Sequence, residues 1–392
     1  MPLLLRYSVR SLAARRTRAL ATVAVVALVV VATALLSSLV SSFTRTLVTS
    51  GSDRNLIVLS KGAASDAASA LPLEAVQVLR DLPGVALDGA GRPLVSPELV
   101  AQPLLGTQNG RREAVVVRGI ESTAFGVHED IRIVRGRRLE PSQGEAIVGR
   151  QIAGRHSGAE VERDLHVGGR SWRIVGVFDS GGSSFESEVW VDARELAADA
   201  KRRLPYSSIR VRMASSSDRD VLTRRIDSEQ RLALEAKPEI DYYREQATSA
   251  DTLYAIVLAV AGLAGLAALF GAANTLYAAV RARRAEIGTL RVLGFSRRTV
   301  LAAFLAESLL LSALGFAVGA LAAPPLAAGM SRLMGGVRFS GGLLSTNIVV
   351  LRVGWEDLAL ALVLALSIGL LGGLPPAARA AQLRPAEALR RV

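Results

Sequence analysis

The chain has 392 residues, half of them apolar, and carries a formal net charge of +12. It is too long for one ordinary globular core and too hydrophobic for a nucleic-acid-binding chain, so we expect no nucleic acid among its partners. It contains no cysteine, which excludes disulfides, thiolate metal sites and cysteine nucleophiles.

The first apolar segment, residues 19–42, is predicted to be a membrane helix. A helix needs about 20 apolar residues to cross about 30 Å of hydrocarbon. A cleavable signal peptide is the alternative, because five arginines precede the segment and several serines follow it. The apolar run is longer than the apolar region of a signal peptide, which usually has about 7 to 15 residues. We therefore expect a retained anchor.

Residues 43–250 have mixed charge and short strands separated by turns, as in a folded soluble domain. Segments rich in Val or Ile predict strands at 55–59, 114–118, 146–148, 173–178, 188–191 and 208–211. Helical spacing predicts helices at 72–82, 219–235 and 238–251, the last running straight into the next span. The segment therefore predicts one α+β domain, of one or two lobes.

Three further apolar segments predict membrane helices at 251–280, 299–326 and 357–378. The helix at 299–326 is expected to end near Pro324 and Pro325, and the last one near Pro375 and Pro376. Residues 327–356 are predicted to be a short loop.

The positive charge is concentrated in three flanks of these spans. Residues 1–18, 281–298 and 379–392 together hold 15 basic and 2 acidic residues, whereas the rest of the chain holds 32 and 33. Positively charged flanks stay in the cytoplasm. We therefore expect a multi-pass protein of the cytoplasmic (inner) membrane, with both termini inside and residues 43–250 and 327–356 outside.

Catalytic motifs are absent from the sequence. No lysine follows a glycine, so the chain lacks a Walker A phosphate-binding loop. Nothing fits the Gly-x-Ser-x-Gly nucleophile elbow. His128, His156 and His166 are too scattered for a helical zinc motif and are expected to be surface or hydrogen-bonding residues. We predict no catalytic, metal-binding or cofactor-binding residue in this chain, and no enzyme activity of its own.

Glu307 is the one acid in the third span. A charge at a membrane-helix centre costs about 2.5 to 3.5 kcal/mol, which makes a proton or substrate relay one interpretation. The alternative is a structural acid near the helix end, hydrated or paired with a nearby arginine, and the scarcity of other polar groups favours it. Small-residue faces predict close helix packing, at Gly262 and Gly265, Gly315 and Gly319, and Gly369 and Gly373.

The segment 281–298 contains the most specific stretch, RARRAEIGTLRVLGFS. It predicts a short amphipathic helix that ends at Gly294. Its apolar side consists of Ile287, Leu290, Val292 and Leu293, and its polar residues are Arg283, Arg284, Glu286 and Arg291. Such a helix usually lies on lipid headgroups. Held between two membrane helices, it is also suited to receive force from a cytosolic partner.

The sequence RRAEIGTLRVLGFSRRTVLAAFLAESLLLSALG resembles the signature of the FtsX and MacB type of ABC transporter permease. LRYSVRSLAARRTRALAT is similar to the amphipathic helix, here 1–18, that leads into the first span of that family. IRIVRGRRLEPSQGEAIVGRQIA and SWRIVGVFDSGG resemble its extracytoplasmic porter-like domain, and LRPAEALR resembles its cytoplasmic ending. The resemblance covers most of the chain.

The resemblance implies a membrane α-helical plus α+β fold, with four transmembrane helices and the α+β domain inserted between the first and second. It implies that 281–298 is the cytoplasmic coupling helix that docks on an ATPase, through Arg284, Glu286, Ile287, Gly288, Leu290, Arg291, Leu293 and Gly294. Glu307 and Gly315 fall at recurring positions of the third span, which implies structural roles. Family members pair two permease subunits, identical or paralogous, with two ATPase subunits that bind ATP and Mg.

The absence of a Walker A motif fits an ATPase on a separate polypeptide, unlike MacB, whose ATPase is fused. The function implied is a permease that couples ATP hydrolysis to movement of its periplasmic domain, for export or transfer of an amphiphilic substrate. A periplasmic adaptor would be a further partner of an exporter, and membrane lipid surrounds the chain. The alternatives are an FtsX-like regulator of a cell-wall hydrolase and an ATPase-independent receptor or scaffold. The large external domain favours transport.

Overall fold

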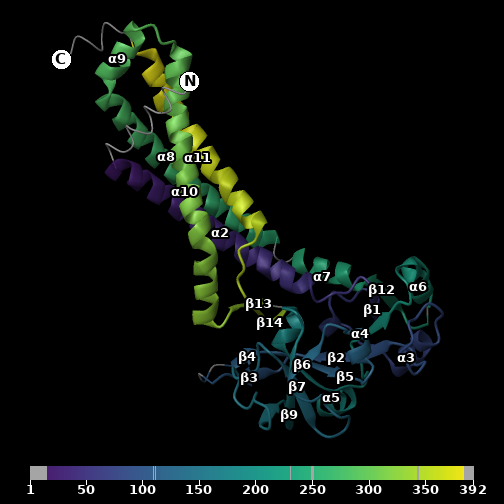
Figure 1. Ribbon diagram of the computed structural model, residues 1–392. Coiled ribbons are helices and arrows are strands. Elements are labelled where there is room, and N and C mark those ends of the chain that lie inside the picture. Colours follow the sequence, from purple (N-terminus) through teal and green to yellow (C-terminus); the bar gives the residue numbers. More distant parts are fainter. Residues whose placement is uncertain are drawn as a thin grey trace. The chain divides into compact units, whose positions relative to one another are not determined.

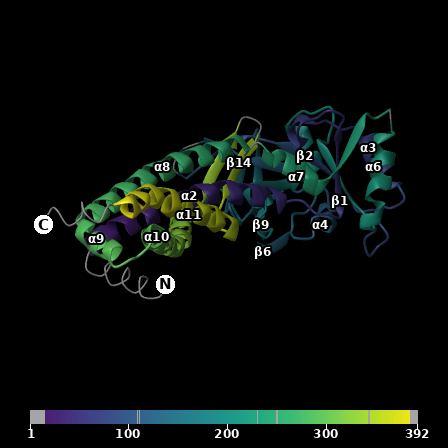
Figure 2. The same ribbon diagram turned by 90° about the horizontal axis from the view of Figure 1, so that it is seen from above.

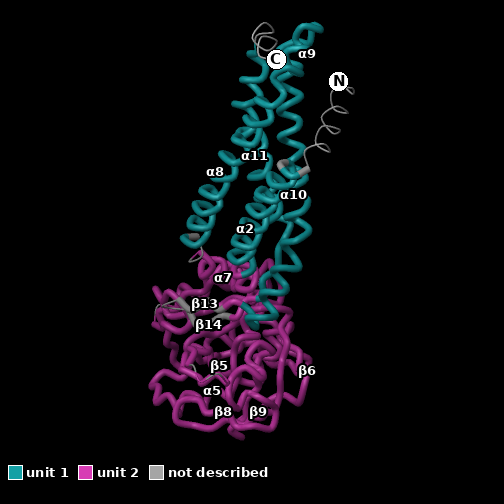
Figure 3. Tube along the Cα trace, turned by 90° about the vertical axis from the view of Figure 1, so that its left-hand side faces the viewer, with its two compact units in different colours: residues 1–42, 250–336, 350–392 teal, residues 43–249, 337–349 magenta. Residues whose placement is uncertain are grey.

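The structure is a computed structural model that describes residues 16–108, 110, 112–229, 231–248, 251–341 and 344–383. The chain divides into two compact units (Figure 3): unit 1 contains residues 1–42, 250–336 and 350–392, and unit 2 contains 43–249 and 337–349. The predicted amphipathic helix at 1–18 and the tail at 379–392 lie largely outside the described residues.

Unit 1 is a bundle of long helices that lie side by side (Figures 1 and 2). Among the described residues, four helices are long and apolar enough to cross a membrane, as predicted. They are α2 (Arg16–Val48), of which residues up to 42 belong to this unit, α8 (Asp251–Ala282), α10 (Arg297–Met334) and α11 (Trp355–Gln382). The short helix α9 (Arg284–Val292) lies between α8 and α10 in the sequence.

The predicted ends of two of these helices are wrong. Helix α10 continues through Pro324 and Pro325 to Met334, and α11 continues through Pro375 and Pro376 to Gln382. Each proline lacks a backbone N–H group, so one carbonyl group in the preceding turn loses its hydrogen-bond donor. Membrane helices tolerate this loss because neighbouring helices and local adjustments satisfy the freed carbonyl groups.

Glycines bring the helices of unit 1 into close contact. A Cβ atom added at Gly315 of α10 would lie 2.6 Å from Cβ of Val26 and 3.0 Å from the carbonyl oxygen of Val23, both on α2. On α11, a Cβ added at Gly373 would lie 2.6 Å from Cβ of Ser308 on α10. A side chain at either position would collide with the neighbouring helix, so the small residues set the distance between helices.

Serine hydroxyls connect α2 to the start of α11. The Ser37 hydroxyl donates to one oxygen of Asp357 at 2.6 Å, and the Ser41 hydroxyl donates to the other at 3.1 Å. The backbone N–H of Gly354 also donates to Asp357, at 2.8 Å. Asp357 is buried. Its carboxyl group therefore accepts three hydrogen bonds, which join α2 to the first turn of α11.

Unit 2 is built around a mixed sheet of ten strands in the part of the chain that the structure describes. The order is β12-β1-β11-β2-β5-β10-β7-β9-β6, with β8 paired to β9. The pairs β5–β10 and β7–β9 are parallel and the others are antiparallel. The bounds are β1 (Asn55–Ser60), β2 (Val95–Ala101), β5 (Val116–Ile120), β6 (Arg132–Gly136), β7 (Glu145–Gly149), β8 (Asp164–Val167), β9 (Arg170–Asp179), β10 (Glu188–Asp192), β11 (Ser208–Arg212) and β12 (Leu234–Pro238).

Shorter elements complete unit 2. Two separate hairpins are β3 (Leu104–Gly106) with β4 (Arg112–Ala114), and β13 (Val337–Gly341) with β14 (Leu344–Val349). The helices are α3 (Leu73–Arg80), α4 (Ala124–Val127), α5 (Ala193–Asp199), α6 (Arg219–Asp227) and α7 (Glu239–Ala247). Three 3₁₀ turns are η1 (Asp66–Ala68), η2 (Ser184–Ser187) and η3 (Ser216–Asp218). The expected fold class, membrane helices with an inserted α+β domain, is confirmed.

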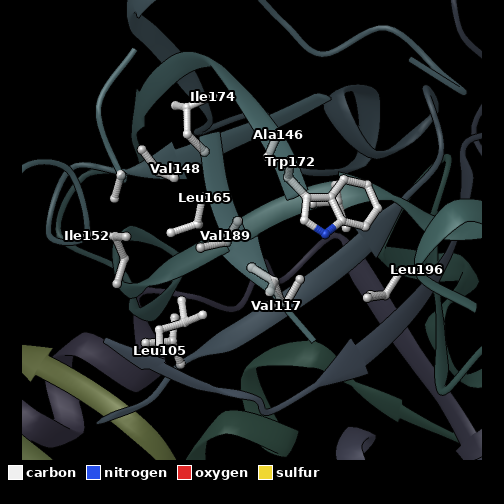
Figure 4. Packing of buried hydrophobic residues seen from close by; sticks show 14 of the residues in the cluster. Leu105, Val117, Ala146, Val148, Ile152, Leu165, Trp172, Ile174, Val189 and Leu196 are labelled. Carbon is white, nitrogen blue, oxygen red and sulfur yellow. The ribbon is translucent and has the colours of Figure 1, made fainter. Parts of the chain in front are cut away.

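Two hydrophobic clusters fill unit 2. One includes Trp172, Val117 and Val189, which Figure 4 draws as sticks with other members of the cluster. The other contains Leu79 of α3, Leu222 of α6 and residues of β1, β2 and β11. Both clusters lie on the same continuous sheet. Burial of these apolar side chains is the main force that stabilises the domain.

The strands expected in this segment are present, with bounds that differ by a few residues. Segment 114–118 is split, since β4 ends at Ala114 and β5 starts at Val116. The helix expected over 219–235 is wrong in its second half: α6 ends at Asp227, and β12 begins at Leu234. There the alternation of Leu234 and Ala236 with polar residues suits pairing with β1.

Two predicted connections have different outcomes. The loop expected at 327–356 contains the hairpin β13–β14, whose Ile348 is buried in the first hydrophobic cluster of unit 2. The continuous helix expected from 238 into the second span falls partly on residues that are not described. Helix α7 ends at Ala247 and α8 begins at Asp251, and the junction at 249–250 lies outside the described residues.

Candidate functional site

Helix α9 is the candidate site, and its two ends are held differently. It starts after Arg283, whose backbone N–H donates to the carbonyl groups of Ala279 and Val280 at the end of α8. The guanidinium group of Arg283 donates to the carboxylate of Glu307 on α10 at 3.1 Å. Both side chains are buried. Helix α9 is thus attached to α8 through the backbone and to α10 through a buried ion pair.

The C-terminal end of α9 has the geometry of a Schellman motif. Gly294 has a φ of +91°, and its N–H donates to the carbonyl of Arg291 at 3.3 Å. The N–H of Phe295 donates to the carbonyl of Leu290 at 3.2 Å. This left-handed conformation favours glycine, and the predicted helix stop at Gly294 is therefore present.

One side of α9 packs on the bundle. Ile287 is 2% exposed and belongs to a hydrophobic cluster with Val280 of α8, Val300 and Phe304 of α10, and Ala377 of α11. Gly288 is also buried. These two residues belong to the predicted coupling set, but the structure places them where they anchor the helix. Neither is available to a partner protein.

The remaining residues of the predicted set are accessible. Arg284, Glu286 and Gly294 are exposed, and Leu290 and Arg291 are partly buried. Leu293 is 70% exposed and the neighbouring Val292 is 60% exposed. The apolar residues of the segment are therefore divided, with Ile287 toward the bundle and Val292 and Leu293 away from it. An exposed apolar pair at a helix end, next to arginines, is suited to contact a partner protein or a lipid surface.

Glu307 and Gly315 of α10 both contact neighbouring helices or segments of the bundle. Glu307 is paired with Arg283, which is the arrangement that the sequence favoured over a relay. Breaking such a buried pair leaves one charge uncompensated and is strongly destabilising. Gly315 lies where α10 crosses α2. We infer that Glu307 fixes the base of α9, whereas Gly315 fixes the spacing of two membrane helices.

A buried ionic network in unit 2 was not predicted from the sequence. Glu98 on β2 accepts hydrogen bonds from Arg118 on β5 at 2.9 Å and from Arg210 on β11. Arg118 also donates to both oxygens of Glu188, at 2.6 and 2.7 Å. Arg210 donates to Glu239 at 2.7 Å, at the start of α7. Every one of these side chains is buried.

His128 completes this network. Its Nε2 lies 2.8 Å from Glu98, and its ring packs against Phe185 and Trp190 with centroid distances of 4.9 and 5.3 Å. His128 is thus a hydrogen-bonding histidine, as expected, although it is buried. Phe185 lies in η2, and Arg118 and Arg210 both lie over its ring. The network therefore joins β2, β5, β10, β11, α7 and η2.

The charges of the network stabilise one another. Burial raises the pKa of Glu98, but the positive charges of Arg210 and Arg118, together with the hydrogen bond to His128, outweigh burial and hold that pKa well below its usual range. Burial lowers the pKa of Arg118 and of Arg210, but Glu188 and Glu98, respectively, raise both above the ordinary value. Glu98 and both arginines are accordingly charged at neutral pH.

The sequence contains a weak signal of this network. In β11 the apolar residues Ile209 and Val211 alternate with Arg210 and Arg212, which suggests one solvent-facing side. The structure covers that side with α4, α7 and η2. Among the described residues, no group of three or more His, Asp or Glu side chains is arranged to hold a metal ion.

Comparison with protein families gives two matches that together cover most of the chain. Residues 19–229 match the family described as MacB-like periplasmic core domain. Residues 258–385 match the family described as FtsX-like permease C-terminal. The second match contains α9, Glu307 and Gly315.

Individual relatives match shorter parts. The macrolide export ATP-binding/permease protein MacB of Bdellovibrio bacteriovorus is 31% identical over 143 residues, which are 36% of this chain and 20% of that protein. The ABC transporter permease YknZ of Bacillus subtilis is 30% identical over 137 residues, 34% of this chain and 31% of that protein. The crystal structure of the periplasmic region of MacB from Actinobacillus actinomycetemcomitans is 14% identical, covers 47% of this chain and 89% of that chain, and has a TM-score of 0.38. The matched parts thus span less than a third of either full-length relative.

Proposed function

The chain belongs to the MacB and FtsX type of ABC transporter permeases, and we propose that it is the membrane subunit of a complex whose ATPase is a separate polypeptide. The observation that carries the proposal is the surface of α9. Val292 and Leu293 are exposed there, while Ile287 anchors the same helix in the bundle. A partner that binds this pair can therefore push on α8 and α10 through a short, firmly attached helix.

The proposed orientation follows from charge. Residues 281–298, which contain α9, carry six arginines against one glutamate. Positively charged flanks favour the cytoplasm. In this orientation α9 faces the cytoplasm, where an ATPase binds ATP and Mg, and unit 2 lies on the opposite side of the inner membrane. The proposed site of ATP hydrolysis is the ATPase subunit.

The proposed cycle uses two copies of the chain, identical or paralogous, and two ATPase subunits. Closure of the ATPase pair on ATP would move α9, and the helices α8 and α10 would carry that movement toward unit 2. Unit 2 would then act on an amphiphilic substrate in export or transfer, with a periplasmic adaptor where the path continues outward. Relatives named for macrolide export and for lipoprotein release support a substrate of this class.

The experiment is co-purification of the tagged full-length chain with an ATPase that carries a Walker A motif. The double substitution Val292→Ala with Leu293→Ala removes the exposed apolar pair and is expected to reduce the co-purified ATPase by about tenfold or more, as for a central binding residue. Leu321→Ala removes an equally exposed leucine from α10 and serves as the control.

The proposal is contradicted if the double variant retains the ATPase and its ATP hydrolysis at the level of the control. The same experiment distinguishes the proposed permease from the main alternative. An ATPase-independent receptor or scaffold would yield no Walker A protein with the unmodified chain.

A further inference from the structure

A cleft lies between α9 and the start of α10, and its lining includes Glu286 and Leu290 of the predicted coupling set but neither Val292 nor Leu293. The space between its walls is small, about 40 Å³, and it is open on one side. Mostly apolar walls with a few polar groups are the usual character of small-molecule sites. The apolar walls come from both helices and from the turn between them, at Ile287, Leu290, Phe295, Val300, Ala303 and Phe304.

The charged groups inside the cleft are compensated at its base. Arg283 and Glu307 line the cleft and form the buried ion pair already described. Glu286 lines its exposed side. The interior therefore suits an apolar chain rather than a charged ligand.

The surroundings of the cleft are strongly basic. Arg284 lies on α9, and Arg297 and Arg298 form the first turn of α10, which leads directly to the lining residue Thr299. All three arginines are exposed, as is Arg281 at the end of α8. None of these four arginines forms an ion pair within the described ranges of the chain. An uncompensated basic rim beside an apolar cleft is complementary to a ligand with an anionic head and an apolar tail.

The position of the cleft matches the depth of a lipid headgroup. Val300, Ala303 and Phe304 lie in the first turns of α10, whose apolar span begins at Arg297. The span of α8 ends at Ala282, beside the base of α9. In the proposed orientation, the cleft therefore lies at the cytoplasmic end of the apolar helices. Basic pockets between membrane helices on the cytoplasmic side hold anionic lipid headgroups.

We propose that this cleft binds one anionic phospholipid of the cytoplasmic leaflet. One acyl chain lies along the open, apolar side of the cleft at Leu290 and Phe295, and the arginines at the start of α10 hold the phosphate. The bound lipid covers this side of α9 and stiffens the helix that receives force. The orientation rests on the proposed function, but binding of the lipid does not require the ATPase.

The test uses the purified full-length chain in detergent, without an ATPase. Native mass spectrometry measures the binding of added phosphatidylglycerol and, in parallel, of phosphatidylcholine. We expect phosphatidylglycerol to bind about tenfold more tightly, since only this lipid gives the basic rim a net negative partner. Equal affinity for the two lipids would overturn the proposal.

Two independent variants locate the site. Ala303→Trp fills the cleft and is expected to weaken phosphatidylglycerol binding by about tenfold or more, whereas Val318→Trp, on an exposed part of the same helix, leaves it unchanged. The double variant Arg297→Gln with Arg298→Gln changes two exposed arginines. It is expected to remove the preference for phosphatidylglycerol while phosphatidylcholine binding stays the same.

The outcomes distinguish this proposal from the proposed function. Unchanged lipid affinity in Ala303→Trp and in the double arginine variant overturns the lipid site, whatever the ATPase does. If Ala303→Trp abolishes ATPase co-purification but not lipid binding, the cleft belongs to the ATPase and the lipid site is again overturned. Lipid binding that persists in Val292→Ala with Leu293→Ala supports a site separate from the ATPase contact.

Discussion

Glu98 depends on its neighbours for its charge in the interior of unit 2. Arg118 and Arg210 both donate to it, and His128 lies 2.8 Å away. Removing one partner from a buried ion pair leaves the others uncompensated and costs about 3 to 5 kcal/mol. The integrity of the sheet between β2, β5 and β11 should therefore depend on this single carboxylate.

We predict that Glu98→Gln lowers the stability of unit 2 by about 3 kcal/mol at pH 7. The measurement is unfolding of the full-length chain in detergent, followed by the fluorescence of Trp172 and Trp190, which are both buried in unit 2. Glu74→Gln, at an exposed position in the first turn of α3, is the control and should change stability by less than about 1 kcal/mol. Equal stability of the two variants would contradict the account.

The effect of Glu98→Gln should also depend on pH. The pKa of Glu98 is lowered in the folded chain from an ordinary value of 4.5. Its stabilising contribution is therefore complete above that ordinary value and decreases as the pH falls toward the folded pKa. We expect the difference between the original chain and Glu98→Gln to be largest near neutral pH and to shrink below pH 4.5. A difference that grows on acidification would show that the assigned sign is wrong.

Individual residues were only partly predictable from the sequence. The position of Glu307 near a helix end, with arginines close by, suggested a structural ion pair, but the sequence could not identify Arg283 as the partner among six candidates in one segment. Ile287 and Leu293 look equivalent in an amphipathic pattern. Only the path of the chain around α9 determines that Ile287 is buried and Leu293 is exposed.

At the scale of elements, close packing of α10 on α2 makes Gly315 irreplaceable. An added Cβ would meet both the side chain of Val26 and the backbone of α2. Adding a carbon atom to a tightly packed contact costs about 1 to 3 kcal/mol. The spacing of α2 and α10 should therefore tolerate no side chain at this position.

We predict that Gly315→Ala destabilises the helix bundle by about 1 to 3 kcal/mol. The matched control is Gly329→Ala on the same helix, where an added Cβ has no atom within 4 Å. This control should be neutral or should stabilise by up to about 1 kcal/mol, because alanine is the better helix former. The measurement is loss of helical circular dichroism as a denaturing detergent is added. Equal midpoints for the two variants are incompatible with the described contact.

Elements were predicted well where composition decides them and poorly where contacts decide them. The four apolar helices follow from hydrophobicity and length. Their ends do not, since α10 and α11 continue through proline pairs. Strand β12 and the hairpin β13–β14 were missed because pairing with β1, and burial of Ile348 in unit 2, depend on residues distant in the sequence.

At the scale of the whole molecule, the distribution of charge predicts which side of the membrane each part occupies. The chain has no cysteine, so a single cysteine can report the exposure of one position to a labelling reagent. Ser228 in unit 2 and Thr289 on α9 are both exposed. They are suitable positions for such a measurement.

We predict that a membrane-impermeant maleimide labels Ser228→Cys in cells whose outer barrier has been opened while the inner membrane is intact. Thr289→Cys should be labelled only after the inner membrane is permeabilised. The physical reason is that basic residues outnumber acidic ones beside α9, whereas basic and acidic residues are nearly balanced in unit 2. Labelling of Thr289→Cys while the inner membrane is intact would reverse the proposed topology and exclude a cytoplasmic ATPase contact.

The central claim is that the energy of ATP hydrolysis enters this chain through α9 and reaches unit 2. The most direct measurement is the spin–spin distance between Ser228→Cys labels on the two copies of the chain, in the complex with its ATPase. We predict that the distance distribution shifts when ATP is trapped, and that the shift is lost in Val292→Ala with Leu293→Ala. An identical distribution with and without trapped ATP, in a complex that hydrolyses ATP, would contradict the account.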